Sequence, residues 1–295
     1  MMIQHELTIV IPAYRCARYL PATVATALRV PGVRVVIVQN CSPDETPKIA
    51  RQLQAEAPDR IEVIDNERTI SMTENWQKAV SLVQTPFALK LDADDLLFDG
   101  YAEAALQVLR QNPGVGMVGA RFVTIGGEDF PPPAAFGRDA RFEIMGGVEA
   151  AHFAVEWRQF PASATMVFRM DSWRQVGGFD LNFGWCPDRE MWFRMPTRFG
   201  VGFTRTPACY YRLYNQNTTA EFAGSGRFLR ELDGLFRKAR VMWPVPSLQN
   251  LYRKRQEHIA YMYGAAIKNL LLQKQYVAAF KMIPLVFGAF RQLAR

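Results

Sequence analysis

Short apolar runs and segments with helical spacing alternate along the first part of the chain, and this alternation most limits the folds available. Strand-like runs lie at residues 7–11, 33–38, 61–64 and 87–91, with a helical pattern after each. Strands separated by helices usually pair in parallel, because each return requires a crossover. We therefore predict an α/β fold with a mostly parallel sheet flanked by helices, extended by a fifth strand at 115–124.

The helical segments complete this pattern. Apolar residues at spacings of three and four predict helices over 16–29 and 72–84. A third helix, ending near residue 57, is expected to begin at Ser42 as its cap, with Pro43 in the first position and Glu45 three residues after the cap.

Polar segments follow three of the predicted strands, at residues 12–15, 39–42 and 92–95. The carboxyl ends of parallel strands meet at one edge of a sheet, and ligands of such sheets bind beyond that edge. We therefore expect these three segments to line one rim and to form a ligand site.

The most distinctive of the three is Asp92-Ala93-Asp94-Asp95, which places three carboxylates within four residues. Carboxylates this close repel each other unless a cation lies between them, and hard divalent metals prefer oxygen ligands and bridge to phosphates. Asp92 and Asp94 are thus candidate ligands for a metal that holds a diphosphate. The alternative is that the acids cap the following helix, expected over 99–111.

Several classes of protein are disfavoured. The stretch from Pro12 to Tyr19 contains no glycine, so the phosphate-binding turn of dinucleotide enzymes is missing where it would have to lie. The four cysteines are far apart, which indicates free thiols in a reducing cytoplasm and not a zinc site or disulfide framework. The first residues do not resemble a signal peptide, and no apolar run is long enough for a transmembrane helix.

The C-terminal part has a different character. Residues 226–295 contain 13 Lys/Arg and 3 Asp/Glu, a net charge of +10, whereas the whole chain carries +7. We expect a basic helical region at 221–295 after a catalytic domain at 1–220. Its last stretch, 274–295, has a basic amphipathic pattern that fits peripheral contact with a membrane, or packing on the domain or on a second subunit. The Gly/Pro-rich segment 125–147 is either lid-like or a plain surface connection.

The remaining pattern predicts a strand at 163–169, a tight turn at 177–180, a helix opening at Asp188 and a short strand at 210–214. Together, the motifs resemble those of family 2 glycosyltransferases, an inverting family with a GT-A-type nucleotide-diphospho-sugar fold. The resemblance covers roughly residues 5–215. The segments that carry it, in order along the chain, are 7–14, 36–46, 75–79, 92–95, 177–180 and 188–194.

The resemblance implies roles for individual residues. Asp188 would be the general base that takes a proton from an acceptor hydroxyl. Asp94, with Asp92, would hold Mg²⁺ or Mn²⁺ on the donor diphosphate. The residues implied in binding the nucleotide-diphospho-sugar donor are Pro12, Ala13, Tyr14, Gln39, Arg68, Lys78, Asp92 and Ala93.

Two positions depart from the family pattern: Gln39 replaces the usual Asp that contacts the base, and Pro187 replaces the Glu before the catalytic base. UDP is the default nucleotide, and a glutamine carbonyl can still accept a hydrogen bond.

We expect a non-processive, cytoplasmic enzyme of cell-surface glycan or polysaccharide assembly, with a glycan or lipid-linked acceptor and peripheral contact with the inner membrane face. The alternative is a non-catalytic sugar-nucleotide-binding or scaffold protein of the same fold. No nucleic-acid partner is expected, because the basic residues lack interleaved stacking motifs.

Overall fold

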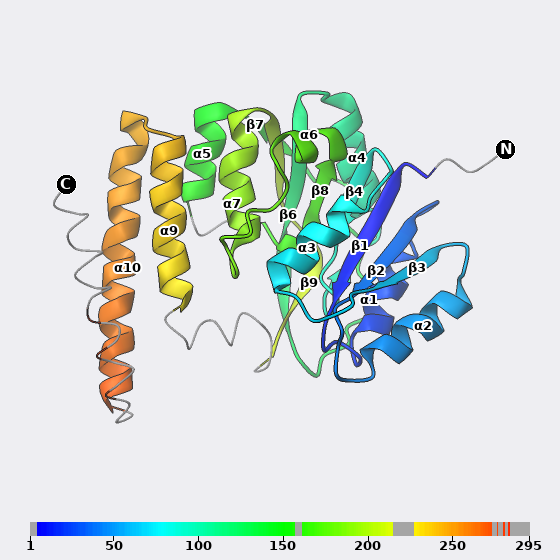
Figure 1. The fold of residues 1–295 in the computed structure, drawn as a ribbon. Helices are drawn as coiled ribbons and strands as arrows, with labels where there is room; N and C mark the ends of the chain where they lie inside the picture. The colour runs from blue at the N-terminus through cyan, green and yellow to red at the C-terminus, as the bar shows by residue number, and fades with distance from the viewer. Residues whose placement is uncertain are drawn as a thin grey trace.

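The computed structural model describes residues 5–156, 161–214 and 227–272, together with positions 276, 280 and 283. Its centre is a nine-stranded sheet with the order β3-β2-β1-β4-β8-β6-β9-β5, and β7 pairs with β9 (Figure 1). The strands are β1 Leu7–Ala13, β2 Arg34–Gln39, β3 Ile61–Asp65, β4 Phe87–Lys90, β5 Leu96–Leu97, β6 Val115–Gly126, β7 Glu143–Met145, β8 Met166–Arg169 and β9 Gly200–Leu213.

Most of the strands run in one direction. The pairs β1–β2, β2–β3, β1–β4 and β6–β9 are parallel, and every antiparallel pair involves β5, β7 or β8. The α/β fold with a mostly parallel sheet is therefore confirmed. The carboxyl ends of β1, β2, β4, β6 and β9 consequently point to the same edge, which brings segments more than a hundred residues apart in sequence to one rim.

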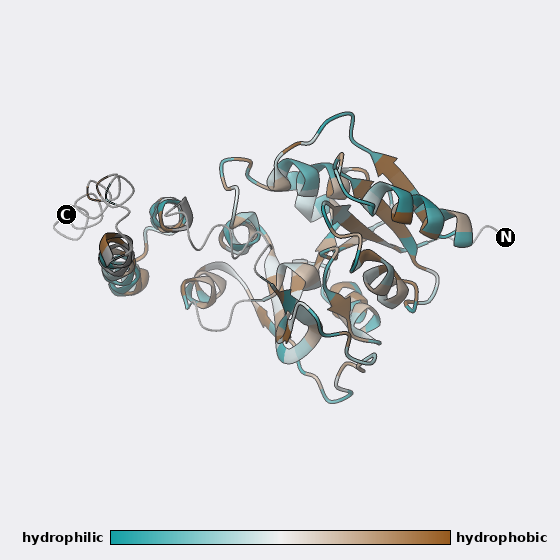
Figure 2. Cartoon of the chain, turned by 90° about the horizontal axis from the view of Figure 1, so that it is seen from below, coloured by the Kyte–Doolittle hydropathy of each residue, from teal (hydrophilic) through white to brown (hydrophobic). Residues whose placement is uncertain are grey.

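Helices cover both faces of the sheet. They are α1 Leu20–Ala27, α2 Thr46–Glu56, α3 Met72–Ser81, α4 Tyr101–Gln111, α5 Gly147–Val155, α6 Met170–Gln175, α7 Pro187–Arg194, α9 Arg227–Met242 and α10 Pro246–Leu272. Successive side chains of a strand point to opposite faces. Ile9 and Ile11 accordingly belong to the hydrophobic cluster that includes residues of α1 and α4, whereas Val10 belongs to the cluster on the other side, which includes residues of α3 and α7. Figure 2 shows the hydrophobic strands enclosed between helices of mixed polarity.

Helix α2 begins later than predicted. The expected cap at Ser42 is wrong: the helix starts at Thr46, with Glu45 in the cap position. Ser42 serves the turn after β1 instead, because its hydroxyl accepts the N–H of Arg15 at 2.7 Å and donates to Asp44 at 2.6 Å. A capping box does occur at α3, where Ser71 and Glu74 satisfy each other's backbone N–H groups.

The middle of the chain contains more regular structure than its composition suggested. Strand β9 has 14 residues, although a strand was predicted only at 210–214. The earlier part was missed because register shifts in its pairing with β6 disrupt the alternating pattern of a regular strand. Within the Gly/Pro-rich segment, β7 and the start of α5 are regular. The stretch between β6 and β7 is fastened to Asp99, whose N–H donates to the Ala134 carbonyl and whose carbonyl accepts the Phe136 N–H, both at 2.8 Å.

The C-terminal helices pack on the α/β part of the chain. Helix α9 lies beside α7, and α10 packs against α9 at the end of the molecule (Figure 1). Leu235 and Phe236 of α9 share one hydrophobic cluster with Met191 and Phe193 of α7. No helix among the described residues is both long and apolar enough to cross a membrane. The amphipathic stretch at 274–295 lies outside the described residues, apart from positions 276, 280 and 283.

Candidate functional site

The strand register assembles the expected rim. Ala13 at the end of β1 is paired with Gln39 at the end of β2, and Val10 is paired with Lys90 at the end of β4. Beyond these pairs, the Asn40 N–H donates to the Ala13 carbonyl at 2.9 Å. The polar segments that follow the three strands therefore lie side by side, as their positions in the sequence predicted.

A pocket of about 280 Å³ opens at this rim. Two aromatic side chains, Tyr14 and Trp76, contribute to its wall, and Asp92 supplies a carboxylate. Tyr14 is 41% exposed, so its ring is available to a ligand. The pocket is lined by Pro12, Tyr14, Asn40, Thr69, Ile70, Met72, Asn75, Trp76, Asp92 and Ala93.

A network of amides stiffens one wall of the pocket. The Asn66 side-chain nitrogen donates to the side-chain oxygens of Asn40 at 2.8 Å and Asn75 at 2.9 Å. Asn40 in turn holds Ile70 through two hydrogen bonds, one to its carbonyl and one from its N–H. The Lys78 ammonium donates to the Asn66 oxygen at 2.7 Å, which places this lysine behind the wall. These contacts fix the loop between β3 and α3.

Below the pocket lies a buried ammonium group. Lys90 is fully buried, and its Nζ lies 3.2 Å from the centre of the Trp76 ring and forms an ion pair with Asp92. The other oxygen of Asp92 accepts the hydroxyl of Ser163. A buried cation needs compensation, and Asp92 supplies the charge while Trp76 supplies the face of an aromatic ring. A lysine inside an apolar strand is unusual, so the sequence could have indicated a role for Lys90. No feature of the sequence indicated the contact of Ser163 with Asp92.

The pKa values of the next two acids, Asp94 and Asp95, are raised. Burial, reinforced by the negative charge of Asp92, raises the pKa of Asp94 to about 6. Burial and the charges of Asp94 and Asp92 also raise the pKa of Asp95. The Tyr214 hydroxyl hydrogen-bonds to Asp94 and partly offsets the rise. These carboxylates are thus incompletely compensated by the protein, as expected where a ligand supplies positive charge.

Arg212 connects the acidic turn to the loop after β6 through its backbone and its side chain. Its backbone N–H donates to Asp95 at 2.9 Å, and its Nε donates to the Asp94 carbonyl at 2.9 Å. Its Nη1 donates to the carbonyls of Gly126 and Gly127 at 3.0 and 3.3 Å. Since β6 and β9 end at the same edge as β4, a fully buried guanidinium can bridge all three. The sequence did not identify this residue.

Asp188 lies in the first turn of α7 and is electrostatically linked to the acidic turn. Burial raises its pKa, whereas the positive charges of Arg189 and Lys90 lower it and the charge of Asp92 raises it. The charges of both Asp92 and Lys90 therefore act on Asp188. A carboxylate with a raised pKa is a stronger base when ionised, which suits proton abstraction.

The acidic turn could hold a metal together with a ligand that supplies further oxygen atoms. In the parts of the chain that the structure describes, no group of three or more His, Cys, Asp or Glu side chains could hold a metal ion. Mg²⁺ is nevertheless commonly bound by one or two carboxylates together with substrate phosphates. The undercompensated charge of Asp94 fits that mode, because a cation beside it would relieve the repulsion from Asp92.

The sequence-predicted residues do not all reach the pocket. Pro12, Tyr14, Asp92 and Ala93 line it. Gln39 is buried, and its side-chain oxygen accepts the N–H of Cys41 at 2.7 Å. The described residues that line the pocket also do not include Ala13, Arg68 or Lys78. A role of these four in donor binding stays a prediction.

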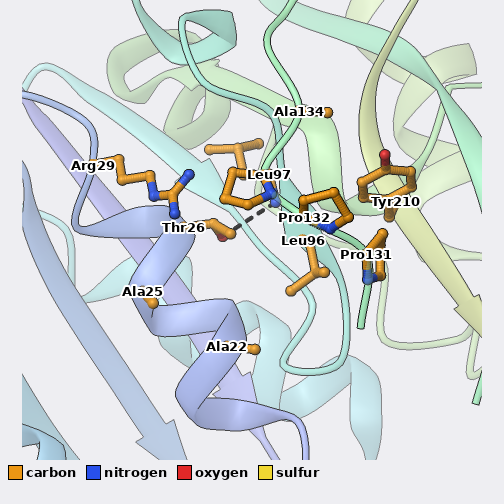
Figure 3. A pocket seen from close by; sticks show the side chains of 11 residues that line it. Ala22, Ala25, Thr26, Arg29, Leu96, Leu97, Pro131, Pro132, Ala134 and Tyr210 are labelled. Atoms are coloured by element: carbon orange, nitrogen blue, oxygen red, sulfur yellow. Dashed lines mark hydrogen bonds between the residues drawn. The ribbon is translucent and has the colours of Figure 1, made fainter. Parts of the chain in front are cut away.

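A second pocket, of about 150 Å³, lies between α1 and the proline-rich segment. Figure 3 shows Ala22 and Ala25 of α1 on one side and Pro131, Pro132 and Tyr210 on the other. Among the described residues that line it, Arg29 alone is charged, and Arg29 is paired with Asp99 at 3.1 Å. This pocket offers few polar groups for a diphosphate, so the rim pocket is the candidate site.

Solved structures of similar fold are GT-A glycosyltransferases. S. aureus TarS in complex with UDP-GlcNAc superimposes with a TM-score of 0.62 at 10% identity, covering 97% of this chain and 92% of that one. The mannosyltransferase PcManGT from Pyrobaculum calidifontis, in complex with GDP-Man and Mn²⁺, gives a TM-score of 0.64 at 15% identity, covering 98% and 87%. At these identities the likeness establishes the fold, which is that of nucleotide-diphospho-sugar transferases.

The family model described as glycosyl transferase family 2 matches residues 8–176, which is more than half of the chain, and the protein belongs to that family. Among curated proteins, the succinoglycan biosynthesis protein ExoA from Rhizobium meliloti (strain 1021) is 28% identical over 203 residues. The match covers 66% of this chain and 60% of ExoA, so the chain spans less than two thirds of that relative's length.

Proposed function

We propose that the protein transfers a sugar from a nucleotide-diphospho-sugar to an acceptor hydroxyl with inversion at the anomeric carbon. The observation that carries this proposal is the grouping of carboxylates around Lys90: Asp92 and Asp94 beside the rim pocket, and Asp188 within electrostatic reach of the same ammonium. A single displacement of this kind is served by carboxylates that hold a metal on the donor diphosphate and by a carboxylate that accepts the proton of the acceptor.

In the proposed reaction, the ionised carboxylate of Asp188 accepts the proton of the acceptor hydroxyl. The hydroxyl oxygen forms a bond to the anomeric carbon while the bond from that carbon to the diphosphate oxygen breaks, and the nucleoside diphosphate leaves with the electron pair. Asp188 is half-buried, and its partial desolvation raises its pKa, which makes its carboxylate a better base.

The rim pocket would bind the nucleotide, with the exposed ring of Tyr14 available for stacking on the base. Asp94, assisted by Asp92, would hold Mg²⁺ or Mn²⁺. When bound, such a metal would neutralise charge on the leaving diphosphate. UDP is the default nucleotide. The structure of PcManGT contains GDP-Man and Mn²⁺, and that of TarS contains UDP-GlcNAc. Binding of both UDP and GDP should therefore be tested.

The acceptor would be a growing surface glycan or a lipid-linked saccharide. Support comes from the ExoA relative, whose name refers to succinoglycan biosynthesis. Peripheral membrane contact through 274–295 remains part of this proposal. It is tested by comparing the binding of the full chain, and of a chain ending at residue 273, to vesicles containing anionic lipid. Equal binding by both chains would contradict it.

The non-catalytic alternative draws support from Asp92, whose two oxygens are already engaged by Lys90 and Ser163. A thermal-shift panel of UDP, GDP, dTDP and CDP, with and without Mn²⁺, comes first, followed by an assay of sugar release from the matching donor. We expect one nucleotide to stabilise the protein only with metal, and Asp188→Asn to abolish release while retaining nucleotide binding. Release that persists in Asp188→Asn would contradict the proposed role of this residue.

A further inference from the structure

We infer that helix α9 positions the helix that carries Asp188, and that Lys238 is the residue through which it does so. This inference rests on the proposed function, in which Asp188 is the base. It assigns the basic C-terminal region a part in catalysis that is independent of any membrane.

Helix α9 holds both ends of α7. Just before α7, the backbone N–H of Trp185 donates to the carboxylate of Glu231 at 2.6 Å. At the other end, the indole N–H of Trp243, which directly follows α9, donates to the carbonyl of Phe193 at 3.0 Å. At this same end of α7, the rings of Phe193 and Phe236 lie 6.2 Å apart in an edge-on arrangement.

Lys238 joins α9 to the middle of this unit. Its ammonium donates to Glu190 at 2.6 Å and to Asp180 of the Gly-Gly-Phe-Asp turn at 2.5 Å. Glu190 is fully buried and also accepts from Arg194, whose Nε and Nη2 each lie 2.7 Å from one of its oxygens. Two carboxylates (Asp180 and Glu190) and two cations (Lys238 and Arg194) thus form a network with no net charge. A buried carboxylate requires such compensation.

Helix α7 depends on tertiary packing for its position, and α9 shares that role with α5 and with Phe153 and Phe203, which pack against Trp192. It has eight residues, and its cap residue, Cys186, makes no side-chain cap hydrogen bond. Helices this short are marginal by themselves, so packing must set where they lie. Glu190 follows Asp188 by two positions in the same first turn, and a displacement of Glu190 therefore displaces the proposed base.

The nucleotide pocket is built from other elements. Its described lining comes from the end of β1, from the segments after β1, β2 and β4, and from the first turns of α3 with the loop before it. It includes no residue of α7 or α9. Loosening α7 should therefore lower turnover without weakening donor binding. A misplacement of about 1 Å in a reacting group can reduce a rate by about 100-fold.

The test compares Lys238→Met, Lys238→Arg and a matched control, Lys48→Met, in the full chain. Lys48 forms an exposed ion pair with Glu45 at 3.1 Å on α2. For Lys238→Met we expect kcat to fall by about 10- to 100-fold with the donor KM unchanged within about twofold, and hydrogen exchange to rise in residues 187–194. Lys238→Arg should recover most of kcat, because it retains the charge, and Lys48→Met should match the wild type.

Lys238→Met leaves Glu190 partly uncompensated, so a second variant guards against failure to fold. The double variant Lys238→Met/Glu190→Gln removes one charge of each sign, and it should still bind the nucleotide but show the same loss of kcat. Wild-type kcat in either variant overturns the inference. Asp188→Asn separates a failure of the proposed function from a failure of this inference. If Asp188→Asn stays active, the proposed base is wrong and the inference falls with it. If Asp188→Asn is inactive while Lys238→Met is fully active, only the inference is overturned.

Discussion

Replacing Asp94 with asparagine removes one charge from the acidic turn with little change in shape, and we expect it to stabilise the ligand-free protein at neutral pH. Asp94 is half-buried near Asp92, and desolvation together with the charge of Asp92 raises its pKa to about 6. A carboxyl whose pKa is raised on folding binds its proton more tightly in the folded state, so its ionisation opposes folding.

The magnitude follows from the two pKa values. Between the ordinary value of 3.8 and about 6, the folded protein holds a proton that the unfolded chain has released. The free energy of unfolding therefore falls as the pH rises through this window, and the loss is complete above it. The full difference corresponds to about 3 kcal/mol. Since Asp94 keeps some contact with solvent, we expect about 1–2 kcal/mol.

Urea unfolding at pH 7.5 and pH 5 measures this effect. Asp94→Asn should be more stable than the wild type at pH 7.5, and its advantage should shrink to about half at pH 5, where the folded carboxyl is mostly protonated. With Mn²⁺ and the matching nucleoside diphosphate at about a hundred times the dissociation constant, the wild type should gain about 2.7 kcal/mol. The variant should gain little, so the order of stability reverses.

Asp59→Asn is the control, because Asp59 is exposed in the turn before β3 and its replacement should have no comparable effect. The reasoning is refuted if Asp94→Asn is less stable than the wild type at pH 7.5 without ligand. That result would mean that the hydrogen bond from Tyr214 outweighs burial and repulsion, and that the turn is already compensated without a metal.

Three further substitutions test other parts of the structure. Arg212→Met should lower the free energy of unfolding by about 3–5 kcal/mol in urea, because it removes the hydrogen bonds that hold the Asp94 turn; a loss below 1 kcal/mol would contradict this. Ser71→Ala removes the capping box with Glu74 and should cost about 1 kcal/mol of thermal stability while the nucleotide affinity stays constant. Tyr14→Ala should weaken nucleotide binding by about 1 kcal/mol, measured by calorimetry, without changing the Tm of the free protein; unchanged affinity would place the base elsewhere.

The parallel strands were predictable because their signal is local. The runs that became β1, β2 and β4 are mostly apolar and almost entirely buried, as expected for strands covered on both faces. Once these strands are placed in one parallel sheet, the segments after them must meet at one edge. The position of Tyr14 and Asp92 in a shared pocket follows from that geometry.

Predictions that depended on competition between contacts fared less well. Ser42, Pro43 and Glu45 have the residue types of a helix start, yet the helix begins at Thr46. Ser42 reaches the N–H of Arg15 in the turn after the neighbouring strand, a partner that local spacing cannot reveal. Strand β9 was largely missed because its register shifts against β6 interrupt the alternation on which strand prediction depends.

The sequence alone determined the alternation of strands and helices from β1 to β4, the rim at which those strands end and the acids placed on that rim, since each depends on residues adjacent along the chain. Only the tertiary structure decided which charges compensate those acids. Lys90 faces Trp76, Arg212 reaches back to Asp94, and Lys238 of α9 meets Glu190 of α7. Such partners are chosen by burial, because a charge taken out of water is stable only beside a group that the fold brings to it from another part of the chain.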